Sequence, residues 1–106
     1  MAGRKLYTTF LTLLAEQERD DAIDWYAKES LITANRWLNE FGHLLDRLED
    51  NPFQYAEHLL FIRRAKLAKF PHHVLYAIDE VNFLVEIIGI RHAIRDPDVI
   101  RRRINF

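Results

Sequence analysis

The chain contains no cysteine, and it has only three glycines and three prolines among its 106 residues. The absence of cysteine excludes disulfide bonds, thiolate nucleophiles, iron–sulfur clusters and cysteine-based zinc sites, and it is consistent with a reducing cytoplasm. No run of about 18 apolar residues is present, so we expect no membrane-spanning helix. Because 49% of the residues are hydrophobic, the chain has enough material for a core, and we expect one domain over residues 1–106.

The charged residues are unevenly distributed along the chain. Residues 1–58 carry six Lys/Arg and eleven Asp/Glu, whereas residues 59–106 carry nine Lys/Arg and five Asp/Glu. The formal net charge of −1 therefore conceals an acidic first half and a basic second half. This asymmetry predicts a polarised surface whose basic part attracts nucleic acid or an acidic protein. The first residues, Met1–Tyr7, lack the apolar segment of a secretion signal, so we expect a cytoplasmic protein.

The first half of the chain predicts one strand and two helices. Apolar, aromatic and β-branched residues over Leu6–Leu13 favour a strand. Apolar residues then recur at helical spacing over Ala15–Lys28 and again over Ala34–Leu48, and the second helix stops before Pro52 because the residue preceding proline is disfavoured in helical geometry. The link at Ser30–Thr33 is short, so the two helices form an antiparallel hairpin.

The second half of the chain predicts three strands with alternating side chains. These runs are Phe61–Leu67, His72–Asp79 and Phe83–His92, and their short connections favour an antiparallel meander. Asp96-Pro97 is typical of the start of a short C-terminal helix. The predicted fold is therefore α+β, in the order β-α-α-β-β-β, with the helices on one face of a single curved antiparallel sheet.

Alternation along the last strands predicts which residues face the helices. We assign the more uniformly apolar set to the helix-covered face: Val74, Tyr76, Ile78, Phe83, Val85 and Ile87. The opposite face then carries mixed apolar and charged residues: Arg64, Lys66, His73, Leu75, Glu86, Ile88, Ile90 and His92. Such a face suits a partner peptide or helix, although an ordinary amphipathic sheet has the same pattern.

Some residues on that face have the chemistry that cleavage of RNA requires. His73 and His92 titrate near neutral pH and are suited to acid–base roles. Arg64, Lys66 and Arg95 are suited to holding phosphate. A solvated, non-catalytic face remains the alternative. We expect no metal site and no cofactor, because the adjacent residues His72 and His73 point to opposite faces of a strand. Trp25 and Trp37 lie on helical faces and are expected in the core.

Five stretches of the sequence resemble the RelE/ParE superfamily of toxins from type II toxin–antitoxin systems, and most closely its ParE-like, plasmid-stabilisation branch. They span nearly the whole chain in the family's order: Ala22-Ile23-Asp24-Trp25-Tyr26, Leu48-Glu49-Asp50-Asn51-Pro52, Arg63-Arg64 through Lys69-Phe70-Pro71, Val74-Leu75-Tyr76-Ala77-Ile78, and His92-Ala93-Ile94-Arg95-Asp96-Pro97. The resemblance implies a toxin that arrests growth and is neutralised by a cognate antitoxin, with which it forms a hetero-oligomer. Members of this superfamily act either as ribosome-dependent ribonucleases on mRNA or as inhibitors of DNA gyrase.

Two departures from the ribonuclease branch favour inhibition of DNA gyrase as the activity of this chain. The resemblance implies an arginine near His73 and a tyrosine or basic group near Ala93, and this chain has neither. Histidine replaces arginine as an acid or base but not as a permanent phosphate clamp. The alternatives are an mRNA endoribonuclease and a non-toxic remnant that only binds antitoxin, so the enzyme question stays open. The resemblance and the face assignment together give a set that binds antitoxin or target: Arg64, Lys66, Leu75, Ile88, Ile90, His92 and Arg95. The catalytic set, for the ribonuclease alone, is Arg64, His73, His92 and Arg95.

Overall fold

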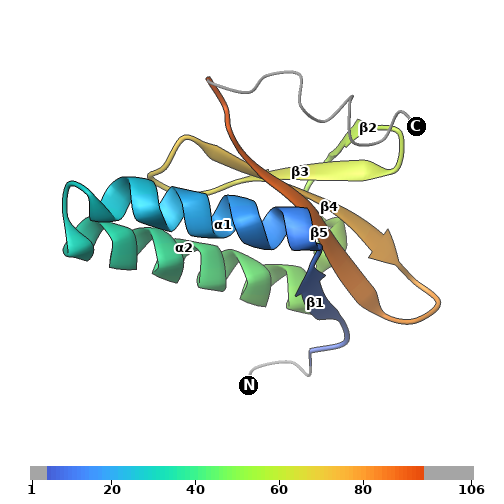
Figure 1. Ribbon diagram of the computed structural model, residues 1–106. Helices are drawn as coiled ribbons and strands as arrows, with labels where there is room; N and C mark the ends of the chain where they lie inside the picture. The colour runs from blue at the N-terminus through green and yellow to red at the C-terminus, as the bar shows by residue number, and fades with distance from the viewer. Residues whose placement is uncertain (1–4, 95–106) are drawn as a thin grey trace.

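The computed structural model describes residues 5–94. The expected residues Arg95 and Asp96-Pro97 lie outside this range. The described residues form two helices packed on one five-stranded sheet (Figure 1). The predicted α+β fold and its order of elements are confirmed. One short strand and the parallel orientation of the first strand were not predicted.

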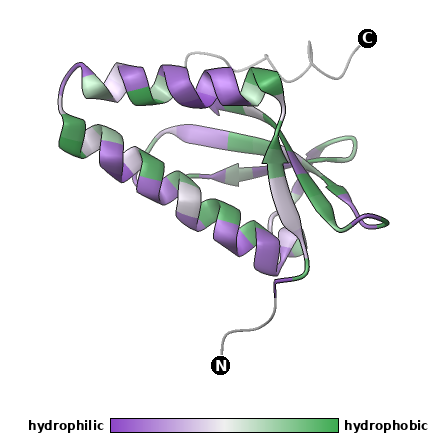
Figure 2. Cartoon of the chain, turned by 60° about the horizontal axis from the view of Figure 1, so that its bottom comes forward, coloured by the Kyte–Doolittle hydropathy of each residue, from purple (hydrophilic) through white to green (hydrophobic). Residues whose placement is uncertain are grey.

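The helical hairpin consists of α1 (Leu13–Ala27) and α2 (Leu31–Asp50). Thr12 caps α1, because its hydroxyl accepts a 3.1 Å hydrogen bond from the Ala15 N–H, and Ser30 caps α2 in the same way through the Thr33 N–H at 3.3 Å. The strict apolar spacing of α2 buries Trp37 and its neighbours along one stripe. Figure 2 shows hydrophobic and hydrophilic residues interspersed along α2, and mostly hydrophilic residues along α1.

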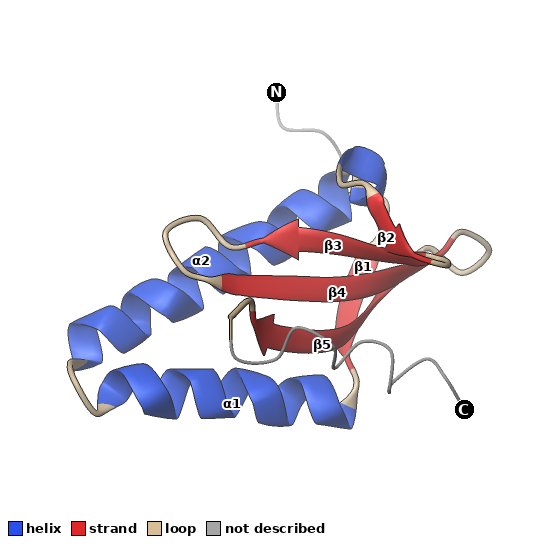
Figure 3. Ribbon diagram, turned by 90° about the horizontal axis from the view of Figure 1, so that it is seen from above, coloured by secondary structure: helices blue, strands red, loops and turns tan. Residues whose placement is uncertain are grey.

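The sheet has the strand order β1-β5-β4-β3-β2. The strand β1 (Thr8–Leu11) is parallel to β5 (Leu84–His92), and all other neighbours are antiparallel. A short 3₁₀ helix, η1 (Pro52–Gln54), follows α2. The remaining strands are β2 (Glu57–Leu59), β3 (Ile62–Lys66) and β4 (His72–Asp79). Viewed from above, α2 passes behind the sheet and α1 lies alongside β5, and no helix of the described residues covers the opposite face (Figure 3). We call this opposite face the open face.

The main core lies between the helices and the sheet. Most of its buried members come from α1, α2 and the three longest strands: Ala15, Ala22, Trp37, Phe41, Leu44, Leu48, Ala65, Val74, Tyr76, Val85, Ile87 and Ile90. Tyr7, Leu67 and Phe70 come from the segments beside them. Tyr76 is fully buried, and its hydroxyl donates a 2.6 Å hydrogen bond to the Pro52 carbonyl. Trp37 is in the core as predicted, but Trp25 is 50% exposed, so the prediction for Trp25 was wrong.

A β-bulge in β5 changes the face of its last residues. Leu75 of β4 opposes Gly89, whereas the next residue, Tyr76, opposes Ile87, so Ile88 is the extra residue of β5. An extra residue reverses the alternation of everything after it. Ile90 therefore joins the main core. The prediction that Ile90 and His92 belong to the open face was wrong, because uniform alternation does not reveal a bulge.

Two further side-chain placements differ from the prediction. Phe83 precedes β5 and has a positive φ of 56°, so it belongs to the turn and not to the predicted strand. Its ring packs edge-on against Tyr7. The first strand was predicted to run to Leu13, but Thr12 caps α1, so the strand ends at Leu11. The hydroxyl of a threonine at that position competes with strand pairing and favours the helix cap.

Candidate functional site

The open face carries basic side chains in register across three strands. Lys66 of β3 opposes His73 of β4, which opposes Arg91 of β5. Two residues before Lys66 on β3, Arg64 opposes Leu75 of β4. Directly opposed residues of neighbouring strands point to the same side of a sheet. We call Arg64, Lys66, His73 and Arg91 the basic cluster.

Histidine 73 is the titratable centre of the basic cluster. Burial and the charges of Arg64, Arg91 and Lys66 hold the pKa of its imidazole below the ordinary value. A positive charge on His73 is disfavoured there because three permanent cations already surround it. The Nδ1 atom of His73 is buried and has no hydrogen-bond partner among the described residues. The resting cluster therefore combines a neutral imidazole with fixed positive charge.

The imidazole of His58 on β2 lies close enough to the basic cluster for the same charges to shift its pKa. Burial lowers this pKa most, and the charges of Arg64 and Arg91 lower it further. Neither His58 nor Arg91 belongs to the site that the sequence predicts. His58 falls on a three-residue strand that carries no alternation signal, and Arg91 reaches the open face only because of the bulge at Ile88.

The apolar residues of the open face form a small core of their own. Ile62 and Leu75 are buried together, with Leu59, Ala77 and Ile88 packed against them. Of the residues predicted to bind a partner, the structure thus brings Arg64, Lys66, Leu75 and Ile88 together on one face. Arg95 is beyond the described residues.

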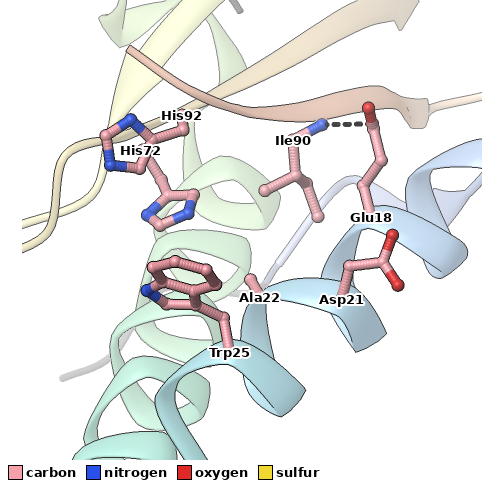
Figure 4. Close-up of a pocket in the computed structure, with 7 residues that line it drawn as sticks. All are labelled: Glu18, Asp21, Ala22, Trp25, His72, Ile90 and His92. Atoms are coloured by element: carbon pink, nitrogen blue, oxygen red, sulfur yellow. Dashed lines mark hydrogen bonds between the residues drawn. The ribbon is translucent and has the colours of Figure 1, made fainter. Parts of the chain in front are cut away.

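The predicted pair His73 and His92 is divided between the two faces of the sheet. His92 lies against His72, with 5.2 Å between their ring centroids. Both line a pocket of about 260 Å³ that is also bounded by Glu18, Asp21 and Trp25 of α1 (Figure 4). The Oε1 atom of Glu18 accepts a 2.9 Å hydrogen bond from the Ile90 N–H in this pocket. His92 is therefore not available to act beside Arg64 and His73.

A metal centre finds no support in the described part of the chain. Within residues 5–94, no group of three histidine or acidic side chains is arranged to hold an ion. None of the helices in that range is both long and apolar enough to cross a membrane. The open face combines the basic cluster with a small apolar cluster.

This fold and surface define a small α+β protein with two helices behind a sheet and a basic cluster in front. The sequence matches, over residues 10–97, the family described as the ParE toxin of the type II toxin-antitoxin system parDE. The chain therefore belongs to the ParE toxin family, within the RelE/ParE superfamily. It is the toxin component of a type II toxin–antitoxin system. No curated protein sequence is significantly similar to it.

Solved structures show the same fold at low sequence identity. The chromosomal ParDE system from P. aeruginosa superposes with a TM-score of 0.70 at 15% identity, covering 84% of this chain and 98% of the other. The RelBE2 toxin–antitoxin complex from Mycobacterium tuberculosis superposes with a TM-score of 0.60 at 19% identity, covering 81% and 96%. At these identities the likeness establishes the architecture and leaves the target open.

Proposed function

We propose that this toxin arrests bacterial growth by binding DNA gyrase in the cytoplasm, and that a cognate antitoxin neutralises it. The observation that supports a binding toxin over a nuclease is the separation of His73 from His92. General acid–base cleavage of RNA needs a base at the attacking 2′-hydroxyl and a protonated acid at the leaving oxygen, both within reach of the same phosphate. The bulge at Ile88 sends His92 to the helix side, so the expected pair does not form.

The pKa shifts support the same conclusion. Both imidazoles near the basic cluster, His58 and His73, have lowered pKa values, so both are mainly neutral at pH 7. A neutral imidazole serves as a base but has no proton to donate as an acid. The resting open face therefore lacks a protonated histidine among its described residues, while its three fixed cations suit an acidic protein surface.

The antitoxin proposal rests on charge and on the solved neighbours. Both neighbours are named as toxin–antitoxin systems. The basic cluster suits an acidic antitoxin segment, and the apolar residues beside it suit burial by that segment. We propose a toxin–antitoxin hetero-oligomer in which this face is covered.

Induction of the toxin in a bacterial host tests the choice of target. We expect thymidine incorporation to fall within minutes while amino-acid incorporation continues, and purified toxin to inhibit supercoiling by gyrase in vitro. Early loss of amino-acid incorporation with intact DNA synthesis would contradict gyrase as the target. Accumulation of soluble protein with neither change would favour a non-toxic, antitoxin-binding remnant.

A ribosome-dependent mRNA endoribonuclease is the second candidate, and the proximity of His58 to the basic cluster favours it. Two imidazoles and three cations are a sufficient set for phosphoryl transfer if a bound phosphate raises one pKa. His58→Ala and His73→Ala then separate the two functions. A nuclease should lose a factor of at least about 100 in cleavage rate with either variant, whereas a gyrase inhibitor should lose only the binding that these contacts provide.

A further inference from the structure

The open face has an acidic end as well as a basic one. A hollow of about 220 Å³ lies away from the basic cluster and is lined by residues of β1, the β2–β3 turn, β4 and β5: Phe10, Phe61, Ala77, Ile78, Asp79, Leu84 and Glu86. Glu86 directly opposes Ala77, which packs in the small core of the open face. Because opposed residues share a side of the sheet, the Glu86 carboxylate belongs to the open face. We call this hollow the acidic pocket.

The acidic pocket combines negative charge with exposed aromatic rings. Hydrogen bonds from Asn82 and from the Val81 N–H hold the pKa of Asp79 below its ordinary value, so this carboxylate is ionised at neutral pH. The Phe61 side chain is 64% exposed, and that of Phe10 is 42% exposed. Aromatic rings beside carboxylates suit a lysine or arginine side chain, because the stem packs on a ring while the charged head meets a carboxylate.

Arg64 and Glu86 lie on either side of the middle of the open face. Arg64 of β3 opposes Leu75 of β4, and Glu86 of β5 opposes Ala77 of β4. Two strand spacings and two residues separate them, which is about 12 Å between their Cα atoms. A two-fold axis that lies parallel to the sheet and crosses β4 between Leu75 and Ala77 therefore places Arg64 of each copy opposite Glu86 of the other copy.

We propose that the free toxin pairs with a second copy of itself through the open face, so that the basic end of each copy covers the acidic pocket of the other. A symmetric pair needs a surface that is complementary to itself. This face meets that need, because it carries both signs of charge on either side of the apolar cluster around Leu75. The proposal goes beyond the antitoxin and the target proposed above, since it concerns the toxin alone.

Three observations favour a second copy as the occupant. A polyanion such as nucleic acid matches only the basic end, because Asp79 and Glu86 repel it at the other end. Within the described residues, the side chains of Arg64 and Glu86 form no hydrogen bond or ion pair, so both charges are available to a partner. The formal net charge of the chain is −1, so two copies have little long-range repulsion to overcome.

Sedimentation velocity of the purified toxin over a range of concentrations tests the proposal. We expect a monomer–dimer equilibrium that weakens as salt is added. Arg64→Glu and Glu86→Arg should each weaken the dimer at least tenfold, because like charges then face each other twice across the axis. Arg36→Glu and Glu40→Arg on α2 are matched controls with the same changes in net charge. Each control should dimerise within about twofold of the wild type.

Mixing the two open-face variants gives the sharper result. In a mixed pair, the introduced carboxylate faces the introduced guanidinium, and the second contact is the original pair of Arg64 and Glu86. Fluorescently labelled Arg64→Glu should therefore sediment as a dimer with Glu86→Arg, within about threefold of the wild-type affinity, and at least tenfold more weakly with Glu40→Arg. This rescue also shows that both variants are folded. A wild-type toxin that stays monomeric at every concentration, or a mixture that associates no better than either variant alone, would overturn the proposal. Neither the antitoxin nor gyrase enters the measurement.

Discussion

The indole Nε1 of Trp37 donates a 3.3 Å hydrogen bond to Nδ1 of His72, inside the core between α2 and β4. Both side chains are buried, Trp37 completely. The bond gives a polar group of the core a partner and couples α2 to the start of β4.

Replacing His72 by leucine should therefore destabilise the protein. The substitution leaves the Trp37 N–H buried without its acceptor, which costs about 1–3 kcal/mol in the free energy of unfolding. Urea unfolding of the variant, followed by tryptophan fluorescence in a Trp25→Phe background, measures the loss. His43→Leu is the control, because His43 lies on α2 outside this contact; an equal loss there would contradict the role of the bond.

A shorter hydrogen bond joins Tyr76 to the carbonyl of Pro52, and its removal should also be costly. Tyr76→Phe retains the ring in the core but leaves the carbonyl, 2.6 Å from the lost hydroxyl, without that donor. We expect a loss of about 1–2 kcal/mol in the free energy of unfolding. Tyr55→Phe, at the half-buried ring that accepts a bond from Arg47, should cost less.

The same burial makes stability fall at high pH. Burial raises the pKa of Tyr76 to about 12, whereas the unfolded chain has the ordinary value near 10. The unfolded state therefore releases its proton first, and stability declines as the pH rises from about 10 to about 12. Denaturant midpoints measured between pH 9 and pH 12 should show a shallower decline in Tyr76→Phe than in the wild type. Equal slopes would contradict this assignment.

His73 should make the protein less stable in acid. Its pKa in the folded protein is below the ordinary value because of burial and the neighbouring cations Arg64 and Arg91. The unfolded state therefore binds a proton first as the pH falls, and stability is lost as the pH falls from about 6.5 through the folded pKa. His73→Gln should flatten this part of the stability profile between pH 7 and pH 5, and an unchanged profile would count against it.

Glu49 closes the exposed edge of β1, and its removal should promote association. Its Oε2 accepts bonds from the Thr9 N–H at 3.0 Å and the Thr9 hydroxyl at 2.9 Å. Free N–H groups at a sheet edge are a template for pairing with another chain. Glu49→Ala should increase the apparent mass in light scattering as protein concentration rises. Asp46→Ala removes only an exposed ion pair with Lys5 and should not.

The sequence by itself determined the two helices, the longer strands and their order, because helical and strand spacing are local properties of the chain. Three features could be predicted in this way: the apolar stripe of α2 that contains Trp37, the end of α2 before Pro52, and the alternation of β3 and β4. Only the tertiary structure decided which of the β5 side chains share the open face. That decision depends on the pairing of Leu75 with Gly89 and of Tyr76 with Ile87, which is a contact between strands. Because of this pairing, His92 lies outside the expected site and Arg91 lies beside His73. The fold also brings His58 close to Arg64. Neighbours across a sheet are set by the register of its strands and not by their separation along the chain.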